Sequence, residues 1–278
     1  MPWAAVIGSP IEHSLSPVLH RAAWDSLGLD GRWEYRRIRV EAADAAELLA
    51  GLDDECRGLS VTMPCKQAVI PALTALDPLA RAVGAVNTVI PSAGILTGFN
   101  TDVHGIVESI RAARRARGLP PARSALVLGA GATASSALAA LGTLGITRST
   151  VAARRFAGHG SVVAAAMRLG VGIDQVAWAD LPAVARAAEE ADVVVSTVPA
   201  GVADVLVDRW RPREDQAVLD VVYSPRDTPM RRACEEAGAC VVDGTQMLVH
   251  QAALQVRLMT GADPDVDAMQ SALAEARG

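Results

Sequence analysis

The sequence predicts an α/β fold built around parallel sheets, and three observations carry this prediction. Apolar stretches of strand length alternate with Ala-rich helical stretches along the whole 278-residue chain. A glycine-rich turn follows one of these strands and begins a helix. The chain is also long enough for two cores, and a cluster of helix breakers at residues 118–121 interrupts it. We therefore expect two α/β domains followed by C-terminal helices.

The first expected domain covers residues 1–101. Its apolar runs predict strands, which we place at 4–7, 33–40, 58–62 and 86–90. Helical periodicity lies between these runs, at 17–27, 43–49 and 76–83.

The second expected domain, residues 102–243, has a more regular alternation. Predicted strands lie at 124–128, 149–153, 175–178, 192–197 and 218–222. Predicted helices lie at 102–117, 133–144, 162–169 and 183–190. A succession of βαβ units gives a mostly parallel, doubly wound Rossmann sheet. The last segment, 245–275, should be helical, with a break near 261–264.

Composition narrows the class of protein. With 51% hydrophobic and 21% charged residues the chain resembles an ordinary soluble enzyme, and a net charge of −5 gives no reason to expect a nucleic-acid partner. The basic run at 111–117 falls late in a predicted helix, where cations complement the helix dipole, so we interpret it as a solvated helix end.

The cysteines and the apolar runs bear on compartment. The four cysteines form no C-x-x-C pair and have no histidine at ligand spacing, which predicts free thiols in a reducing compartment and no metal site. No signal peptide is evident at residues 1–8, and no apolar run reaches the roughly 18 residues of a membrane span. We expect a cytoplasmic protein without a membrane partner. An edge strand near the N-terminus leaves a homodimer open.

A cofactor site follows from the glycine-rich turn. Its residues fit G-x-G-x-x-A between an apolar strand and a helix, and they are Gly129, Ala130, Gly131, Ala132, Thr133 and Ala134. In that context the first glycine permits the tight turn, the second lets the backbone approach a pyrophosphate, and the helix N-terminus supplies N–H donors.

The absence of an acidic residue after the glycine-rich turn indicates which cofactor is bound. An NAD site needs Asp or Glu about 20 residues later, to bind the ribose 2′-hydroxyl. After Gly129 no acidic residue occurs before Asp174, and Arg154 and Arg155 stand at the end of the second strand. Two guanidinium groups suit a 2′-phosphate, so NADP is the predicted cofactor. The alternative is a pair of arginines at the surface without a ligand.

Several polar residues stand at the ends of predicted elements. Ser16 precedes Pro17 and is expected to cap the helix at 17–27, although Ser14 and Ser16 beside a helix N-terminus could also bind a carboxylate. Lys66 follows a strand and Asp102 begins a helix. Taken singly, each is more often an ordinary surface or first-turn residue than a catalytic one.

Taken together, the stretches around these residues resemble the shikimate dehydrogenase family over nearly the whole chain. The matching segments are 10–17, 58–66, 84–88, 98–105, 191–201, 220–225 with Thr228, and 244–252. The resemblance implies a reversible NADPH-dependent reduction of 3-dehydroshikimate to shikimate in the chorismate pathway of aromatic amino acid biosynthesis.

The resemblance also implies that residues 1–101 bind the substrate, that residues 102–243 bind NADP and that the helices of 244–278 pack back on the substrate domain. It further implies residue roles. Lys66 and Asp102 would form the catalytic pair, with Lys66 as the proton donor. The substrate carboxylate would be held by Ser14 and Ser16. Its hydroxyls would be bound by Thr62, Asn87, Asp102 and Gln251, with Tyr223 nearby. NADP would be held by the glycine-rich turn and the two arginines, and would lie along Thr197, Pro199, Gly244 and Met247.

The sequence departs from the family pattern in three places. Arg21 follows His20 where Asn is usual, and Ala132 replaces a common glycine. Ala153 and Arg155 replace the outer members of the usual Asn-Arg-Thr/Ser triplet, which bears on how strictly NADP is preferred over NAD.

Two alternatives to a shikimate dehydrogenase stay open at this point. One is a quinate/shikimate dehydrogenase that uses NAD; such enzymes often carry threonine where Ser16 stands. The other is a non-catalytic relative that binds a metabolite or cofactor. Retention of both Lys66 and Asp102 argues against it, because a pure binder needs no proton donor.

Overall fold

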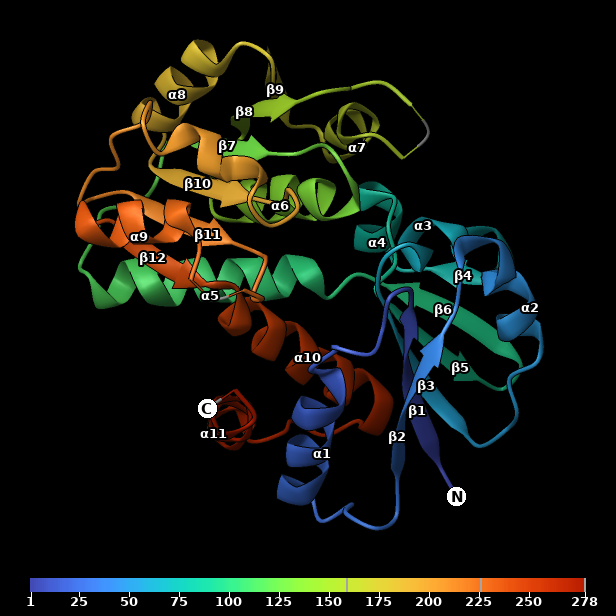
Figure 1. The fold of residues 1–278 in the computed structure, drawn as a ribbon. Helices are drawn as coiled ribbons and strands as arrows, with labels where there is room; N and C mark the ends of the chain where they lie inside the picture. Colours follow the sequence, from blue (N-terminus) through green and yellow to red (C-terminus); the bar gives the residue numbers. More distant parts are fainter. Residues whose placement is uncertain (159, 226, 278) are drawn as a thin grey trace. The chain divides into compact units, whose positions relative to one another are not determined.

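The computed structural model describes residues 1–158, 160–225 and 227–277. The chain divides into two compact units, each with its own sheet (Figure 1). The first unit joins Met1–Asp102 to Leu248–Gly278, and the second is Val103–Met247. The first unit is therefore built from both ends of the chain.

The first unit contains a six-stranded sheet in the order β2-β1-β3-β5-β6-β4. Its strands are β1 (Trp3–Gly8), β2 (Glu34–Arg39), β3 (Cys56–Val61), β4 (Ala75–Leu76), β5 (Thr88–Ser92) and β6 (Ile95–Phe99). β1 pairs in parallel with β2 and β3, whereas β5 is antiparallel to both β3 and β6. β4 and β6 were not predicted from the sequence, and β4 occupies the start of the segment expected to be the helix at 76–83.

Helices cover this sheet, and the C-terminal helices contribute to its core. They are α1 (Ser16–Ser26), η1 (Ala42–Asp44), α2 (Ala45–Ala50), α3 (Cys65–Ala68), η2 (Ile70–Ala72), α4 (Pro78–Val83), α10 (Gly244–Thr260) and α11 (Val266–Glu275). Leu19 of α1 lies in one apolar cluster with Val249 and Val256 of α10 and Leu273 of α11. Removing these apolar side chains from water stabilises the packing of residues 248–277 on α1.

The expected cap of α1 is wrong by one residue. The N-cap residue is Leu15, and its carbonyl accepts from the amide of Leu19 at 3.3 Å. Ser16 therefore lies inside the first turn and makes no side-chain capping bond. Pro17 still occupies the first turn, where its missing N–H costs nothing.

The second unit contains a parallel six-stranded sheet in the order β12-β11-β10-β7-β8-β9. The strands are β7 (Ala125–Leu128), β8 (Arg148–Ala153), β9 (Gly172–Ala177), β10 (Val193–Ser196), β11 (Ala217–Asp220) and β12 (Cys240–Asp243). The order reverses at β7, as in a doubly wound sheet. This confirms the predicted α/β fold class with a Rossmann sheet.

The helices of the second unit follow the predicted pattern, except that η3 and α9 were not predicted. They are α5 (Asp102–Ala116), α6 (Ala132–Thr143), α7 (Val162–Leu169), α8 (Leu181–Glu190), η3 (Val202–Leu206) and α9 (Pro229–Glu236). The strand β12 was not predicted either. Half of the residues of α9 are charged, and it buries only Met230 and Cys234, four residues apart, which is too narrow an apolar stripe to stand out in the sequence.

The interpretation of residues 111–117 as a solvated helix end is wrong for Arg114. Its side chain is buried, with 8% of the residue exposed, and it donates to the carbonyls of Asp192 at 3.0 Å and Pro120 at 2.5 Å. Arg117 donates to the carbonyl of Gly238 at 2.9 Å. These arginines hold α5 to loops of the second unit, so the run is partly structural.

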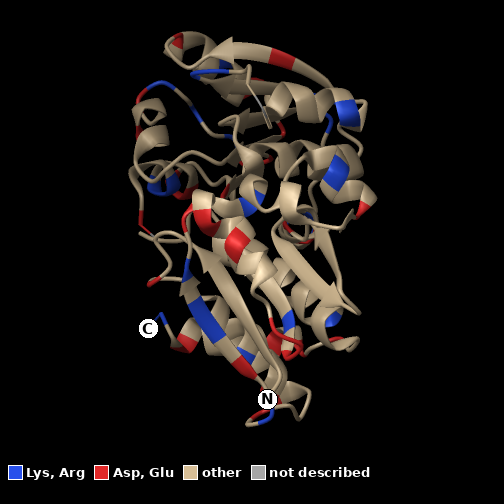
Figure 2. Cartoon of the chain, turned by 90° about the vertical axis from the view of Figure 1, so that its right-hand side faces the viewer, with Lys and Arg blue, Asp and Glu red and all other residues tan. Residues whose placement is uncertain are grey.

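The remaining sequence expectations concern charge, thiols and membranes. Basic and acidic residues are interspersed over the elements seen in Figure 2. All four cysteines are free, as predicted, and all four are buried. Within the described residues, no helix has the length and apolar character required to cross a bilayer.

Candidate active site

Lys66 and Asp102 form an ion pair in the first unit. Lys66 lies in α3, which begins four residues after β3 ends, and Asp102 opens α5. The Nζ of Lys66 is 2.5 Å from Oδ2 of Asp102, and their side chains are only 16% and 6% exposed. The carboxylate also lies in a first helical turn, where the helix dipole favours an anion. Lys66 and Asp102, which the sequence does not mark as functional when each is taken alone, thus form an ion pair that is largely shielded from solvent.

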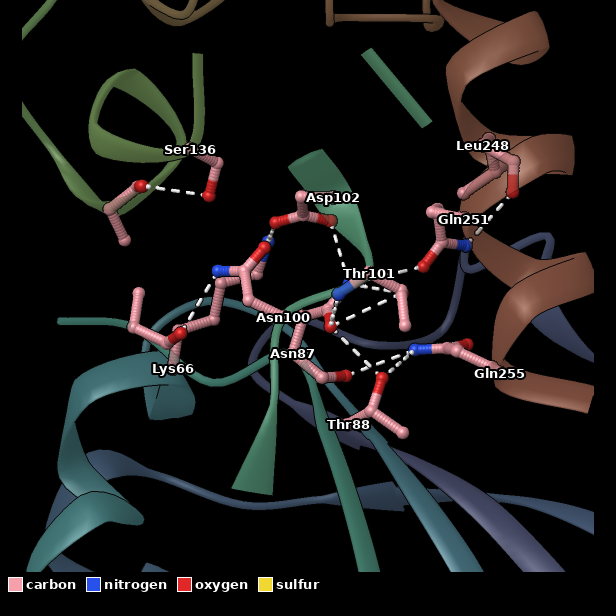
Figure 3. Close-up of polar contacts among 12 residues, drawn as sticks. Lys66, Asn87, Thr88, Asn100, Thr101, Asp102, Ser136, Leu248, Gln251 and Gln255 are labelled. Atoms are coloured by element: carbon pink, nitrogen blue, oxygen red, sulfur yellow. Dashed lines mark hydrogen bonds and ion pairs between the residues drawn. The ribbon is translucent and has the colours of Figure 1, made fainter. Parts of the chain in front are cut away.

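Asn87 lies against the other oxygen of Asp102 (Figure 3). Its Nδ2 donates to Oδ1 of Asp102 at 2.8 Å and to Oγ1 of Thr101 at 2.8 Å. Oε1 of Gln251, from α10, is 3.4 Å from the same nitrogen. Four predicted site residues, Lys66, Asn87, Asp102 and Gln251, therefore form one cluster.

The elements of the first unit position this cluster. The backbone amide of Val86 donates to the carbonyl of Lys66 at 2.8 Å, which ties α3 to the residue before Asn87. The amide of Asn87 donates to Phe99 at the end of β6, and Thr101 N–H donates to Oδ1 of Asn87 at 2.7 Å. Hydrogen bonds to the backbone of Phe99 and Thr101 thus fix the position of Asn87 relative to Asp102.

The two serines form a separate feature at the start of α1. Ser14 Oγ accepts from the amide of Ser16 at 3.3 Å, and the carbonyl of Ser14 accepts from Nη2 of Arg37 at 2.8 Å. Ser16 is 6% exposed. Burial raises the pKa of the neighbouring Tyr35 well above its usual value, and hydrogen bonds with Ser60 and Ser16 oppose part of that rise. Carboxylate binding by the two serines stays a prediction.

Two more residues expected at the substrate are placed by the structure in different units. Thr62 follows β3 directly, is half-buried, and donates its amide to the carbonyl of Ile7 at 2.9 Å. Tyr223 belongs to the second unit, in the segment after β11. The roles of both residues toward the substrate stay predictions.

The glycine-rich turn of the second unit joins β7 to α6. Gly129 has φ +109°, and a Cβ there would lie 2.4 Å from Oγ1 of Thr197, so only glycine fits. Thr197 in turn donates its hydroxyl to the carbonyl of Leu128 at 2.8 Å. The turn and the residue after β10 are therefore packed into each other.

Gly131 is different, because nothing in the described protein lies within 4 Å of a Cβ built on it. It is the N-cap of α6, and no side chain caps that helix. An open glycine before an uncapped N-terminus leaves room and backbone donors for a phosphate group. The residues of this turn, from Gly129 to Ala134, therefore fit the pyrophosphate of a dinucleotide.

The end of β8 carries the two arginines. Arg154 and Arg155 are exposed immediately after Ala153, the last residue of the strand. The first acidic residue after the turn, Asp174, is already engaged by Arg148 through a two-point ion pair. That pair lies toward the start of β8, because Asp174 is in register with Thr150. The arrangement supports a 2′-phosphate rather than a 2′-hydroxyl at the strand end.

Three more residues were expected along the cofactor. Pro199 is exposed after β10, and Met247 is 7% exposed in α10. A Cβ on Gly244 would lie 2.5 Å from the carbonyl of Asp220, so packing against β11 alone requires glycine there. Contact of these residues with a cofactor stays a prediction.

Sequence reasoning missed the second layer of polar residues behind Asn87. Gln255 and Ser60 are 1% and 4% exposed, and both are hydrogen-bonded. One signal was available: Gln251 and Gln255 are four residues apart and so share a helix face. Two amides on one face of a mostly apolar helix indicate a buried polar network.

Comparisons with known proteins identify relatives of this chain. Residues 6–89 match the model of the shikimate dehydrogenase substrate binding domain, and residues 244–274 match that of the shikimate 5′-dehydrogenase C-terminal domain. A shikimate dehydrogenase (NADP(+)) from Citrifermentans bemidjiense is 38% identical over 98% of this chain and 94% of its own.

Two solved structures share the fold over nearly the whole chain. The shikimate dehydrogenase of Mycobacterium tuberculosis has a TM-score of 0.87 at 37% identity, covering 99% of this chain and 100% of the other. The quinate dehydrogenase of Corynebacterium glutamicum, solved in complex with NAD, has a TM-score of 0.84 at 30% identity, covering 99% of both chains. With 38% identity to a shikimate dehydrogenase (NADP(+)) over 98% of its length, the chain belongs to the shikimate dehydrogenase family.

Proposed function

We propose that the protein is a shikimate dehydrogenase, which catalyses the reversible NADPH-dependent reduction of 3-dehydroshikimate to shikimate in aromatic amino acid biosynthesis. The observation that carries this proposal is the buried cluster of Lys66, Asp102, Asn87 and Gln251 in a member of this family. The cluster offers an ammonium, a carboxylate and amides to a small molecule rich in hydroxyl groups.

Lys66 is the proposed proton donor. Reducing a ring ketone requires a hydride at carbon and a proton at oxygen; NADPH, when bound, supplies the hydride. The Lys66 ammonium stabilises the developing negative charge on oxygen and transfers its proton there. In the oxidative direction the neutral amine accepts the proton from the hydroxyl.

Asp102 orients Lys66 and binds a substrate hydroxyl. Its Oδ2 holds the Lys66 ammonium at 2.5 Å, and its Oδ1 accepts from Asn87. A carboxylate has about four acceptor positions, so sites remain for a hydroxyl of the substrate. The amides of Asn87 and Gln251 are proposed to contact the ring hydroxyls, with Thr62 and Tyr223. The substrate carboxylate is assigned to Ser14 and Ser16.

The domain roles follow from these assignments. Residues 1–101 are the main substrate domain, on which the helices of 244–278 pack, and residues 102–243 are the main NADP domain; Asp102 and Tyr223 also contact the substrate. The turn from Gly129 to Ala134 holds the pyrophosphate, Arg154 and Arg155 hold the 2′-phosphate, and Thr197, Pro199, Gly244 and Met247 line the rest of the dinucleotide. The cytoplasmic location and the homodimer expected from the sequence stay predictions.

Oxidation of quinate with NAD is the second candidate, because a quinate dehydrogenase shares this fold at 30% identity. Two observations favour shikimate and NADP: the higher identity to a shikimate dehydrogenase (NADP(+)) and the two arginines without a free acidic residue at the end of β8. Ser16, where quinate enzymes often carry threonine, points the same way.

The catalytic assignment is tested with Lys66→Ala. We measure NADPH consumption with 3-dehydroshikimate and, separately, NADPH binding by fluorescence. General acid catalysis contributes roughly 10²–10⁴-fold, so kcat should fall by about that factor while NADPH binding changes little. A variant that keeps more than about a tenth of the wild-type kcat would refute Lys66 as proton donor.

A further inference from the structure

A chain of buried hydrogen bonds reaches Asn87 from behind, on the side away from Asp102. Gln255, from α10, donates through Nε2 to the carbonyl of Asn87 at 3.0 Å and to Oγ1 of Thr88 at 2.9 Å. Thr88 Oγ1 donates to Oδ1 of Asn87 at 2.9 Å. Gln255 thus holds Asn87 both directly, at its backbone, and through one hydroxyl, at its side chain (Figure 3).

Ser60 binds the oxygen of the Gln255 amide. Ser60 Oγ donates to Oε1 of Gln255 at 2.7 Å, and Tyr35 donates its hydroxyl to Ser60 at 2.6 Å. The carbonyl of Asn87 can only accept, so Nε2 must face Asn87 and Thr88, and Oε1 is left to accept from Ser60. Tyr35, Ser60 and Gln255 are each 4% exposed or less, so water does not compete for these bonds.

The orientation of the Gln255 amide also affects the orientation of the Asn87 amide, which contacts the catalytic pair. Because both Thr88 Oγ1 and the amide of Thr101 donate to Oδ1 of Asn87, the Asn87 side chain must point Nδ2 the other way. Nδ2 then donates to Oδ1 of Asp102. In this chain of hydrogen bonds each side chain donates to the next one. The order is Tyr35, Ser60, Gln255, Thr88 and Asn87, and Asn87 donates to the Asp102 carboxylate that holds Lys66.

We propose that Gln255 is a positioning residue: it sets the orientation of the Asn87 amide and thereby the acceptor geometry of Asp102 toward the substrate. This inference rests on the proposed function, because it assigns Asn87 and Asp102 to substrate hydroxyls. Gln255 itself is separated from Asp102 by Asn87 and acts through it.

Gln255→Glu tests the donor direction with a side chain of the same shape. The introduced carboxylate has no donor, so Thr88 would turn its only proton toward that carboxylate and release Oδ1 of Asn87. Protonation of the introduced carboxyl group restores one donor, and burial places that protonation at a higher pH than for an exposed carboxyl. The loss of activity should therefore be greatest at high pH and smaller at low pH.

We measure shikimate oxidation with NADP⁺ from pH 6 to pH 9 for the wild type and the variant. The expected result is a kcat/KM for shikimate about tenfold below wild type at pH 9, on the order of one lost positioning hydrogen bond. The ratio to wild type should recover toward one at pH 6, with KM for NADP⁺ unchanged within about twofold. A ratio that is constant with pH, or a variant equal to wild type at pH 9, overturns the inference.

Val256→Ala is the matched control for stability. Val256 is the next residue of α10, is fully buried, and packs in the apolar cluster with α1 and α11 rather than on Asn87. It should lower Tm while keeping kcat/KM within about twofold of wild type at every pH. An equal, pH-dependent loss in Val256→Ala would mean that loosening α10 explains the Gln255 result, and would overturn the inference.

Thr88 provides a second pair of variants if Gln255→Glu fails to fold. Thr88→Ser keeps the hydroxyl and should stay within about twofold of wild type, whereas the isosteric Thr88→Val should lower kcat/KM about tenfold. Equal values for the two variants overturn the inference. A wild-type protein without turnover in this assay would instead refute the proposed function, and the inference with it.

Discussion

His20 predicts a specific loss of stability in acid. The residue is fully buried in α1, its ring stacks on Tyr35 with centroids 4.1 Å apart, and its Nδ1 is 2.9 Å from the carbonyl of Ser16. Burial lowers its pKa from 6.5 to about 4, and the bond to Ser16 opposes only part of that shift. His20 is therefore neutral in the folded protein at pH 5, whereas in the unfolded chain it is mostly protonated.

The sign and size of the effect follow from linkage. As pH falls below 6.5 the unfolded chain binds a proton that the folded chain does not, so the free energy of unfolding decreases until the pH reaches about 4. At about 1.4 kcal/mol per pKa unit, the loss between pH 7 and pH 5 is about 2 kcal/mol. Below about pH 4 this residue contributes no further loss.

Urea unfolding followed by tryptophan fluorescence measures this loss, with His20→Gln as the reference that cannot titrate. The variant should be less stable than wild type at pH 7, because it loses the ring stack on Tyr35. Between pH 7 and pH 5, however, wild type should lose about 2 kcal/mol more than the variant. Equal losses in the two proteins would refute the claim that His20 is buried in its neutral form.

Three other predictions concern the site and the second unit. Asp102→Asn should lower kcat roughly 10²-fold or more and raise KM for shikimate, because it removes the anion that holds Lys66 and a hydroxyl acceptor; unchanged steady-state kinetics would refute both roles. Replacing Arg154 and Arg155 by Ala should raise KM for NADPH selectively, and an equal rise for NADH would show that they do not bind the 2′-phosphate. Arg114→Met should lower the free energy of unfolding by about 1–3 kcal/mol, because two loop carbonyls lose a buried donor; an unchanged urea midpoint would contradict that.

Much of the fold could be predicted because βαβ units repeat a strong pattern. The strand at 149–153 and the helix at 162–169 agree with β8 and α7 almost residue for residue. The hairpin between β5 and β6 could not be predicted, because its turn places Ala93 at φ 49° and Gly94 at φ 78°. Two positive φ values favour Asn-Gly or Asp-Gly, and an alanine gives no such signal.

In the candidate site, too, features with a local cause could be predicted from local patterns, and contacts between distant residues could not. The glycine-rich turn between β7 and α6 could be predicted because its glycines have a local cause, and the structure gives Gly129 a steric reason in Thr197. The pairing of Lys66 with Asp102 was expected only from the family resemblance, because local sequence patterns do not connect residues 36 positions apart. Gln255 was missed for a related reason: its partners Ser60 and Asn87 come from distant strands, so only the folded chain shows that it is satisfied.

The central claim is that this protein couples oxidation of shikimate to reduction of NADP⁺. One spectrophotometric comparison at 340 nm tests it most directly: shikimate with NADP⁺ against quinate with NAD⁺, under the same conditions. We expect kcat/KM for shikimate with NADP⁺ to exceed that for quinate with NAD⁺ by at least about tenfold, the ratio that roughly 1.4 kcal/mol of transition-state binding gives. Preferential turnover of quinate with NAD⁺, or no turnover of either pair, would contradict the claim.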